Sequence, residues 1–296
     1  ELATGLLLAG LYACYYLLRL RPDVGPFAET WPMYLAHGTL LCGLLVCSMV
    51  DAQFFIIPLE VIWLCGGAGF LAAVADPFAF PRMAAVGPDV AAGAGGALAG
   101  LGVSIALQHA GYLQQSFLDA EDVPIRGPDP SDDASGAADI PAGGGRPTCA
   151  VAATADDGLS PRREILREVL FLLPVAAGFV GARGLLTIWP EAGSAWAGWF
   201  DAARHPLLAP RLAAAGTGLF GLLVGGAWIW GTRVLGTLGF GKEAMGLGDV
   251  HLLAAAGLVT GWIVPSVAFF VAPVLGVLWA LFLFASRRQR ELPYGP

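Results

Sequence analysis

Long apolar runs alternate with short polar stretches along this chain, a pattern typical of a protein that crosses a membrane several times. Eight such runs are candidates for membrane-spanning helices, and the seventh is short, which suits a helix buried among others. They are Leu2–Leu18, Met33–Val50, Phe54–Val74, Val90–Leu107, Val169–Trp189, Leu212–Trp230, Val250–Val264 and Ser266–Phe284. The pattern predicts an all-α, polytopic transmembrane helical bundle with about eight spans, the last two separated near Pro265. Gly93, Gly96 and Gly100 have small-residue spacings that favour close helix contact within such a bundle.

Residues 119–160 interrupt this pattern. They are rich in Asp, Glu, Pro, Gly, Ala and Ser and show no apolar period, so we expect a disordered acidic loop. The loop divides the chain into a first membrane part, residues 1–118, and a second, residues 161–296. A helix is expected to begin at Ser160-Pro161, because serine is a favoured N-cap and proline a favoured first helical residue.

Composition supports the membrane assignment. The 296 residues are 56% hydrophobic and 13% charged, with a mean hydropathy of +0.68, whereas soluble proteins carry about 25% charged residues. The net charge of −7 comes largely from the acidic loop, and no basic face indicates a nucleic-acid partner. None of the five cysteines forms a CxxC motif, so we expect them to be small apolar residues rather than metal ligands.

Positive charges predict the orientation in the membrane, because cytoplasmic loops are enriched in Lys and Arg. With eight spans, both chain ends and the acidic loop lie on one side, which receives ten of the sixteen basic residues. That side is therefore predicted to be the cytoplasm. In this topology Asp51 follows an inward-running span and Asp249 precedes an outward-running one, so both acids reach the cytoplasmic end of the bundle.

Asp51 and Asp249 are the candidate functional residues. A charged group within a membrane costs about 2.5–3.5 kcal/mol at a helix centre, so such acids indicate function by default. Two carboxyl groups held close together share one proton. The ionised group can then take a proton from water while the neutral one donates to a carbonyl oxygen, as in aspartic proteases. This chemistry needs no metal, but it needs a wet pocket, which the cytoplasmic membrane edge supplies.

Two motifs around these acids resemble the prepilin peptidases, the type IV leader peptidases of the GxGD membrane aspartic protease class. Gly246-Leu247-Gly248-Asp249-Val250-His251 is similar to the GxGD block of that family, and Asp51 with Pro58 seven residues later is similar to the block that carries the other acid. Glycine permits tight turns and close approach of another chain. Gly246, Gly248 and Pro58 are therefore expected to shape the site.

The resemblance implies an activity and a location. Asp51 and Asp249 would be the catalytic pair of an aspartic-type endopeptidase in the bacterial inner membrane, with its active site on the cytoplasmic side. The substrate would be a type IV prepilin or a type II secretion pseudopilin, cut between its basic leader and its hydrophobic helix. Proteolysis would need no cofactor and no metal, and the partners would be this substrate and the lipid bilayer, not nucleic acid.

The chain also departs from the family pattern. Many members carry an amino-terminal segment with paired CxxC motifs and methylate the new N-terminus with S-adenosylmethionine. No stretch here matches that segment, so S-adenosylmethionine is expected only if such a segment precedes this sequence. His251 stands where the family usually has lysine, and we assign it no catalytic role.

Three other interpretations remain open at this point. Asp51 and Asp249 could bind a cation or relay protons in an ion- or proton-coupled transporter, a use to which paired intramembrane acids are also put. They could be interfacial charges at helix ends, or belong to an inactive structural member of the same fold. Transporters often contain an internal repeat, and we find no convincing duplication between the two halves.

Overall fold

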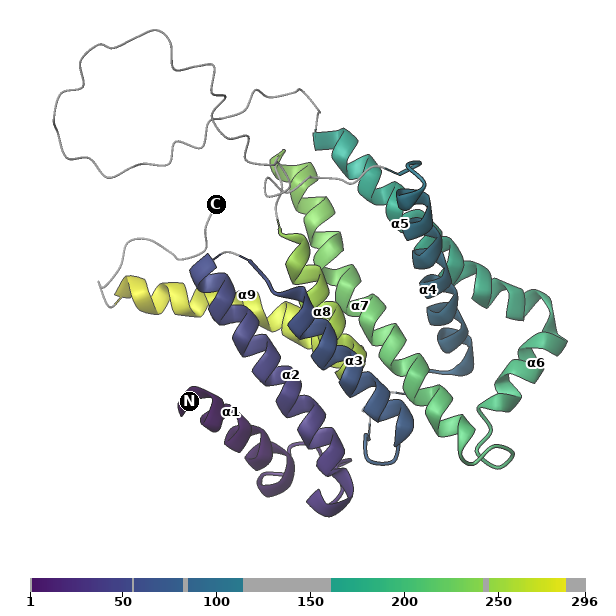
Figure 1. Cartoon of the computed structure of the whole chain (residues 1–296), viewed down its shortest axis with the longest axis horizontal. Coiled ribbons are helices and arrows are strands. Elements are labelled where there is room, and N and C mark those ends of the chain that lie inside the picture. Colours follow the sequence, from purple (N-terminus) through teal and green to yellow (C-terminus); the bar gives the residue numbers. More distant parts are fainter. Residues whose placement is uncertain (1, 55, 82–84, 114–160, 242–244, 286–296) are drawn as a thin grey trace, which may run out of the picture.

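The computed structural model describes residues 2–54, 56–81, 85–113, 161–241 and 245–285 (Figure 1). These residues form helices and no strand, which confirms the predicted all-α bundle. In chain order the elements are α1 (Leu2–Tyr12), the π-helical turn η1 (Ala13–Leu17), α2 (Phe27–Phe54), α3 (Leu59–Ala75), α4 (Pro88–His109), α5 (Pro161–Ile188), α6 (Pro190–Trp199), α7 (Leu208–Phe240), α8 (Leu247–Thr260) and α9 (Ile263–Ala285).

Most of these helices belong in a bilayer. Five of them are long and apolar enough to cross a membrane: α2, α4, α5, α7 and α9. Three shorter apolar segments, α1 with η1, α3 and α8, complete eight segments that correspond to the eight predicted runs. The chain is therefore a multi-pass membrane protein. The short helix α6 was not predicted, and Trp196 Nε1 fixes it by donating to the Pro88 carbonyl at 2.6 Å.

Two predicted boundaries around Asp51 were wrong. Helix α2 continues to Phe54, so Asp51 lies within its last turns instead of following it. The third helix begins at Leu59, not at Phe54. Pro58 explains the second difference, because proline disfavours a helical conformation in the residue before it while allowing a helix to start after it.

Further along the chain, two more boundaries differ from the predictions. Helix α7 extends to Phe240, well beyond the expected end at Trp230. The break between the last two helices lies at Gly261 and Trp262, not at Pro265. Gly261 ends α8 with a φ of 82°, which glycine adopts without steric cost. Helix α5 does begin at Pro161, as predicted.

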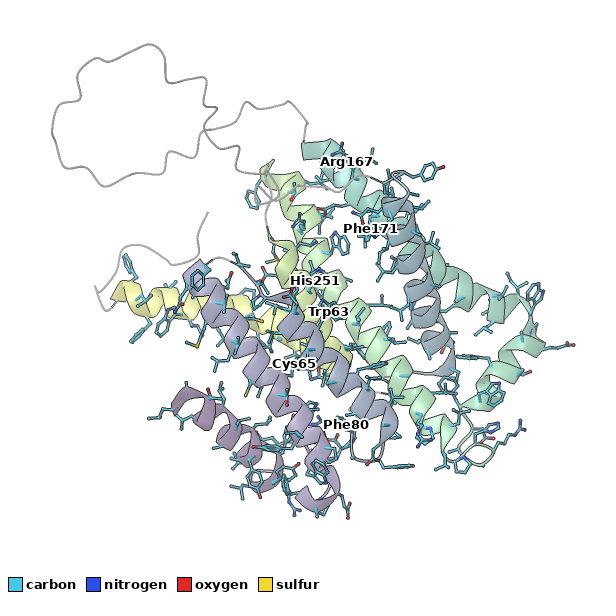
Figure 2. All side chains as sticks on the ribbon, in the orientation of Figure 1. Trp63, Cys65, Phe80, Arg167, Phe171 and His251 are labelled. Carbon is cyan, nitrogen blue, oxygen red and sulfur yellow. The ribbon has the colours of Figure 1, made fainter. Side chains whose placement is uncertain are left out.

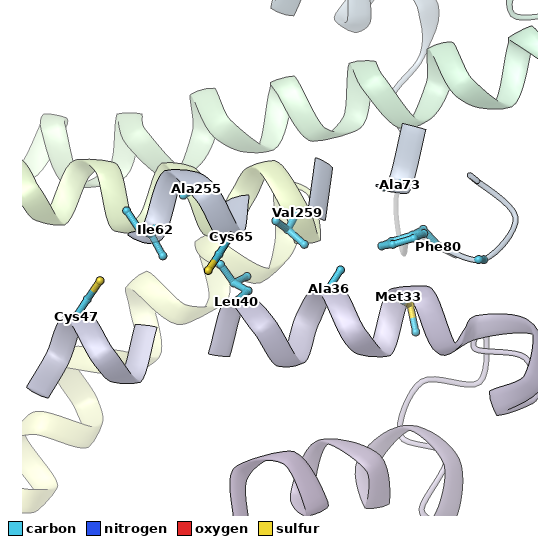
Figure 3. Packing of buried hydrophobic residues seen from close by; sticks show 11 residues of the cluster. Met33, Ala36, Leu40, Cys47, Ile62, Cys65, Ala73, Phe80, Ala255 and Val259 are labelled. Atoms are coloured by element: carbon cyan, nitrogen blue, oxygen red, sulfur yellow. The ribbon is translucent and has the colours of Figure 1, made fainter. Parts of the chain in front are cut away.

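The bundle forms by packing helices from both sides of the acidic loop against one another (Figure 1). Helix α4 pairs with α5, while α8 packs against α7 and α3, and α3 also packs against α2. Buried apolar residues fill the space between α2, α3 and α8, including Met33, Leu40, Ile62, Ala255 and Val259 (Figure 3). This core joins the helix that carries Asp51 to the helix that carries Asp249.

The predicted close contact through small residues is confirmed in the α4–α5 pair. A Cβ atom at Gly96 would collide with the Gly178 carbonyl, and one at Gly100 with the Pro174 carbonyl. Because backbone atoms cannot move aside as a flexible side chain can, these positions require glycine. Neighbouring Gly95 faces open space.

We expect Gly96→Ala to separate α4 from α5 and to lower the stability of the protein by about 1–3 kcal/mol or more, as overpacking does. Gly95→Ala is the matched control and should leave stability unchanged. Thermal unfolding in detergent micelles, followed by circular dichroism, measures both. Equal midpoints for the two variants would contradict the close α4–α5 contact.

Candidate functional site

The two candidate acids lie at the same end of the bundle. Asp51 is exposed near the end of α2, and Asp249 is half-buried as the third residue of α8. Helices α2 and α8 contact each other, and Asp51 is close enough for its charge to act on the Asp249 carboxyl group. Asp249 thus belongs to a helical first turn, where the sequence led us to expect a glycine-rich turn before the helix.

Pro58 shapes the connection from Asp51 to α3. Its carbonyl oxygen accepts a hydrogen bond from the Val61 amide at 3.2 Å and lies 3.8 Å from the Cys47 sulfur, whose S–H donates to it. Cys47 is buried one turn before Asp51 on α2. The Pro58 carbonyl therefore fixes the start of α3 against the end of α2.

Gly248 forms the direct contact between the two motifs. A Cβ atom on Gly248 would lie 2.7 Å from Cδ1 and 3.1 Å from Cβ of Ile57, the residue before Pro58. The absence of a side chain thus lets the start of α8 rest on the connection that follows Asp51. Gly246 differs, since it is exposed, has a φ of −67° and would meet nothing with an added Cβ.

His251 lies on α8, three residues after Gly248. Its ring meets that of Trp63 on α3 edge to face, with centroids 5.7 Å apart, and Figure 2 shows the two side chains together. His251 is half-buried there, so it packs against a neighbouring helix. This contact gives the residue a packing role and places α3 beside the first turn of α8.

Glycines also hold α8 against α7. A Cβ atom at Gly221 would collide with the Gly257 carbonyl, and one at Gly225 with the Leu253 carbonyl. The two backbones therefore touch along most of the length of α8, so its position depends on these residues having no side chains. The sequence contained this signal, because the glycines of α7 recur at the spacing of one helical face.

A buried ion pair lies beside the site and was not predicted from the sequence. Arg233 lies inside α7 and is buried, and its guanidinium pairs with Glu168 on α5. Arg233 is an isolated charge within an apolar stretch, and Glu168 is the last charge before the apolar run that starts at Val169. Their opposite signs were the available signal. We had assigned Glu168 no role.

Parts of the predicted organisation lie outside the described residues. These include the acidic loop, residues 119–160, and both Lys242 and Glu243 just before the Gly246–Asp249 motif. Within the described ranges, no group of three or more His, Cys, Asp and Glu side chains could hold a metal ion. Asp51 and Asp249 bring two carboxyl groups to this end of the bundle.

Comparison with known proteins gives one partial similarity. The chain matches no protein-family model, and no solved structure matches it. A 79-residue stretch, 26% of this chain, is 37% identical to a prepilin leader peptidase/N-methyltransferase of Pseudomonas putida. The match covers 27% of that protein, so about a quarter of either chain is similar.

The contact at Gly248 can be tested with a matched pair of variants. Gly248→Ala should push Ile57 away and lower stability by about 1–3 kcal/mol, whereas Gly246→Ala should have no effect. Combining Gly248→Ala with Ile57→Ala should restore part of the loss, because it removes Cδ1, the Ile57 atom that would lie nearest. Unfolding midpoints of the unaltered protein, Gly248→Ala, Ile57→Ala and the double variant give the coupling between the two positions, and a coupling of zero would disprove the contact.

Proposed function

We propose that this protein is a membrane aspartic endopeptidase in which Asp51 and Asp249 activate a water molecule. The observation that carries the proposal is their placement: one acid lies in the last turn of α2 and the other in the first turn of α8, at one end of the bundle and near enough to interact. The partial similarity to a prepilin leader peptidase/N-methyltransferase supports the same conclusion.

The mechanism follows from the chemistry of two neighbouring carboxyl groups, one ionised and one protonated. The ionised group accepts a proton from water as the water oxygen attacks the scissile carbonyl carbon. The protonated group donates to the carbonyl oxygen, giving a tetrahedral intermediate. When the C–N bond breaks, the protonated carboxyl group gives its proton to the leaving amine. The ionised one takes a proton from a hydroxyl group of the intermediate, whose C=O bond re-forms, so the pair ends with one proton again.

The proposed substrate class rests on the resemblance of the Asp51 and Asp249 motifs to the prepilin peptidases and on the partial similarity to a prepilin leader peptidase/N-methyltransferase. We propose that the substrate is a type IV prepilin or a type II secretion pseudopilin, whose basic leader lies in the cytoplasm and whose hydrophobic helix lies in the inner membrane. A site at the cytoplasmic membrane edge meets the junction between these two segments. Proteolysis of this kind uses no cofactor, and methyl transfer from S-adenosylmethionine is no part of the proposal.

The proposal predicts that Asp51→Asn and Asp249→Asn each lower the cleavage rate by about 100-fold or more, because each removes one half of the acid–base pair. Both variants should remain folded. Membranes containing the protein are mixed with a prepilin, and the shortened product is measured by mass spectrometry. Asp89→Asn is the matched control, since this exposed acid begins α4 at the opposite end of the bundle and pairs with Arg183.

Cleavage by either Asn variant at the rate of the unaltered protein would refute the assignment of the pair. If the folded protein cleaves none of several prepilins but conducts protons into liposomes, and the same Asn variants stop this flux, the acids serve transport instead. The two measurements therefore separate a protease from an ion-coupled transporter on the same set of variants.

A second prediction concerns pH. The cleavage rate should rise and then fall as pH increases, because at low pH both carboxyl groups are protonated and no base remains, while at high pH both are ionised and no acid remains. Cleavage rates measured in membranes over a range of pH test this. A rate that follows a single ionisation would contradict a shared-proton pair.

A further inference from the structure

A buried network of charges connects α5, α7 and the turn before α8. Arg233 Nε donates to Glu168 Oε1 at 2.8 Å, and Trp230 Nε1 donates to Glu168 Oε2 at 3.1 Å. Both charged side chains are 3% exposed. Phe171 stacks on the Trp230 ring with centroids 5.6 Å apart, which closes one side of the network. Figure 2 shows Phe171 on α5, in the same end of the bundle as the candidate site.

Arg233 also reaches the segment that leads to Asp249. Its Nη1 donates to the Met245 carbonyl oxygen at 2.8 Å. Met245 immediately precedes Gly246, and α8 begins two residues later at Leu247. The Nε–H of Arg233 thus binds a carboxylate on α5, while its Nη1–H binds the backbone just before the helix that carries Asp249. Arginine suits this task because its planar group has several donors in fixed directions.

A contribution to stability alone is a weak explanation for this arrangement. Removing two charges from water is costly, and buried ion pairs can often be replaced by apolar residues without loss of stability. The Met245 carbonyl needs only a hydrogen-bond donor, yet its donor is a charged guanidinium group that is itself bound by the Glu168 carboxylate. Gly246 lies between Met245 and Asp249. Even an added Cβ atom there would meet no neighbour, so Gly246 does not hold this segment in place by packing.

We propose that Arg233 is a positioning residue: fixed by Glu168, which Trp230 binds in turn, it holds the start of α8 through the Met245 carbonyl and thereby sets the position of the Asp249 carboxyl group. The effect of Arg233 on the cleavage rate rests on the proposed function, whereas its effect on the position of α8 does not. Arg233 acts through the backbone and does not need to touch the substrate. Displacing a reacting group by about 1 Å can cost roughly 100-fold in rate.

The test must separate this role from the effect of an unpaired buried charge. A single Arg233→Met change removes the Arg233 ion pair from the buried Glu168 carboxylate, and such a protein can fail to fold. We therefore combine Arg233→Met with Glu168→Met, which removes both charges and the donor to Met245 together. Arg233→Lys is the second variant, because it keeps a charge opposite Glu168 but lacks the fork that spans Glu168 and Met245.

Hydrogen exchange gives a readout that does not depend on cleavage. In an α-helix the amides of His251, Leu252 and Leu253 donate to the carbonyls of residues 247–249, so they report on the first turn of α8. We expect them to exchange roughly tenfold faster in the double Met variant, while Leu258, at the other end of α8, remains unchanged. In the cleavage assay kcat should fall roughly 10- to 100-fold with KM unchanged.

Unchanged exchange at residues 251–253 together with unchanged kcat in the folded double variant would overturn the inference. If the double variant does not fold, Arg233→Lys takes its place. Unchanged exchange at residues 251–253 together with unchanged kcat in Arg233→Lys would then overturn the inference. If the unaltered protein cleaves no prepilin, the proposed function fails, and exchange alone still shows whether Arg233 holds the start of α8.

Discussion

The close approach of α8 to its neighbours is the constraint on which the site depends. Helix α8 has 14 residues, is too short to cross a bilayer unsupported, and carries Asp249 in its first turn. Glycines at 221 and 225 bring the α7 backbone against it, and Gly66 of α3 lies against Ala255 on its other side. Because no side chain intervenes, small errors in packing would be transmitted directly to the position of Asp249.

Asp51, the second acid, is positioned by a different set of contacts. Asp51 lies on α2, and its distance from α8 is set by the core of apolar side chains and by the connection that ends at Pro58. Ile57 contacts both that core and Gly248, so it links the two motifs. Arg233 anchors the start of α8 from the side of α5. Three separate contacts therefore determine where the helix ends that carry the two carboxyl groups lie.

Much of the fold could be predicted from hydrophobic patterning, because a bilayer requires long apolar helices whose backbone groups are satisfied internally. The pattern indicated eight membrane segments and a helix start at Pro161. It placed several ends wrongly, since apolar residues continue through helix breaks at Pro58 and Gly261. Helix α6 was missed because ten residues that cross no membrane leave no long apolar run.

The candidate site was predictable only in part. Asp51, Asp249 and the glycines could be selected as candidates because rare residue types stand out in an apolar sequence. The Glu168–Arg233 pair was not found, because the partners are 65 residues apart and a single sequence does not show which charges meet. The different roles of Gly246 and Gly248 also depend on a tertiary neighbour, Ile57.

The central claim is that Asp51 and Asp249 form one site. Cross-linking in native membranes tests it most directly: both acids are replaced by cysteine in a chain whose own cysteines are changed to alanine, and short bifunctional thiol reagents are added. The account predicts an efficient cross-link between positions 51 and 249, and none between positions 89 and 249, since Asp89 begins α4 at the opposite end of the bundle. A cross-link at 51 and 249 no stronger than this control would contradict the account.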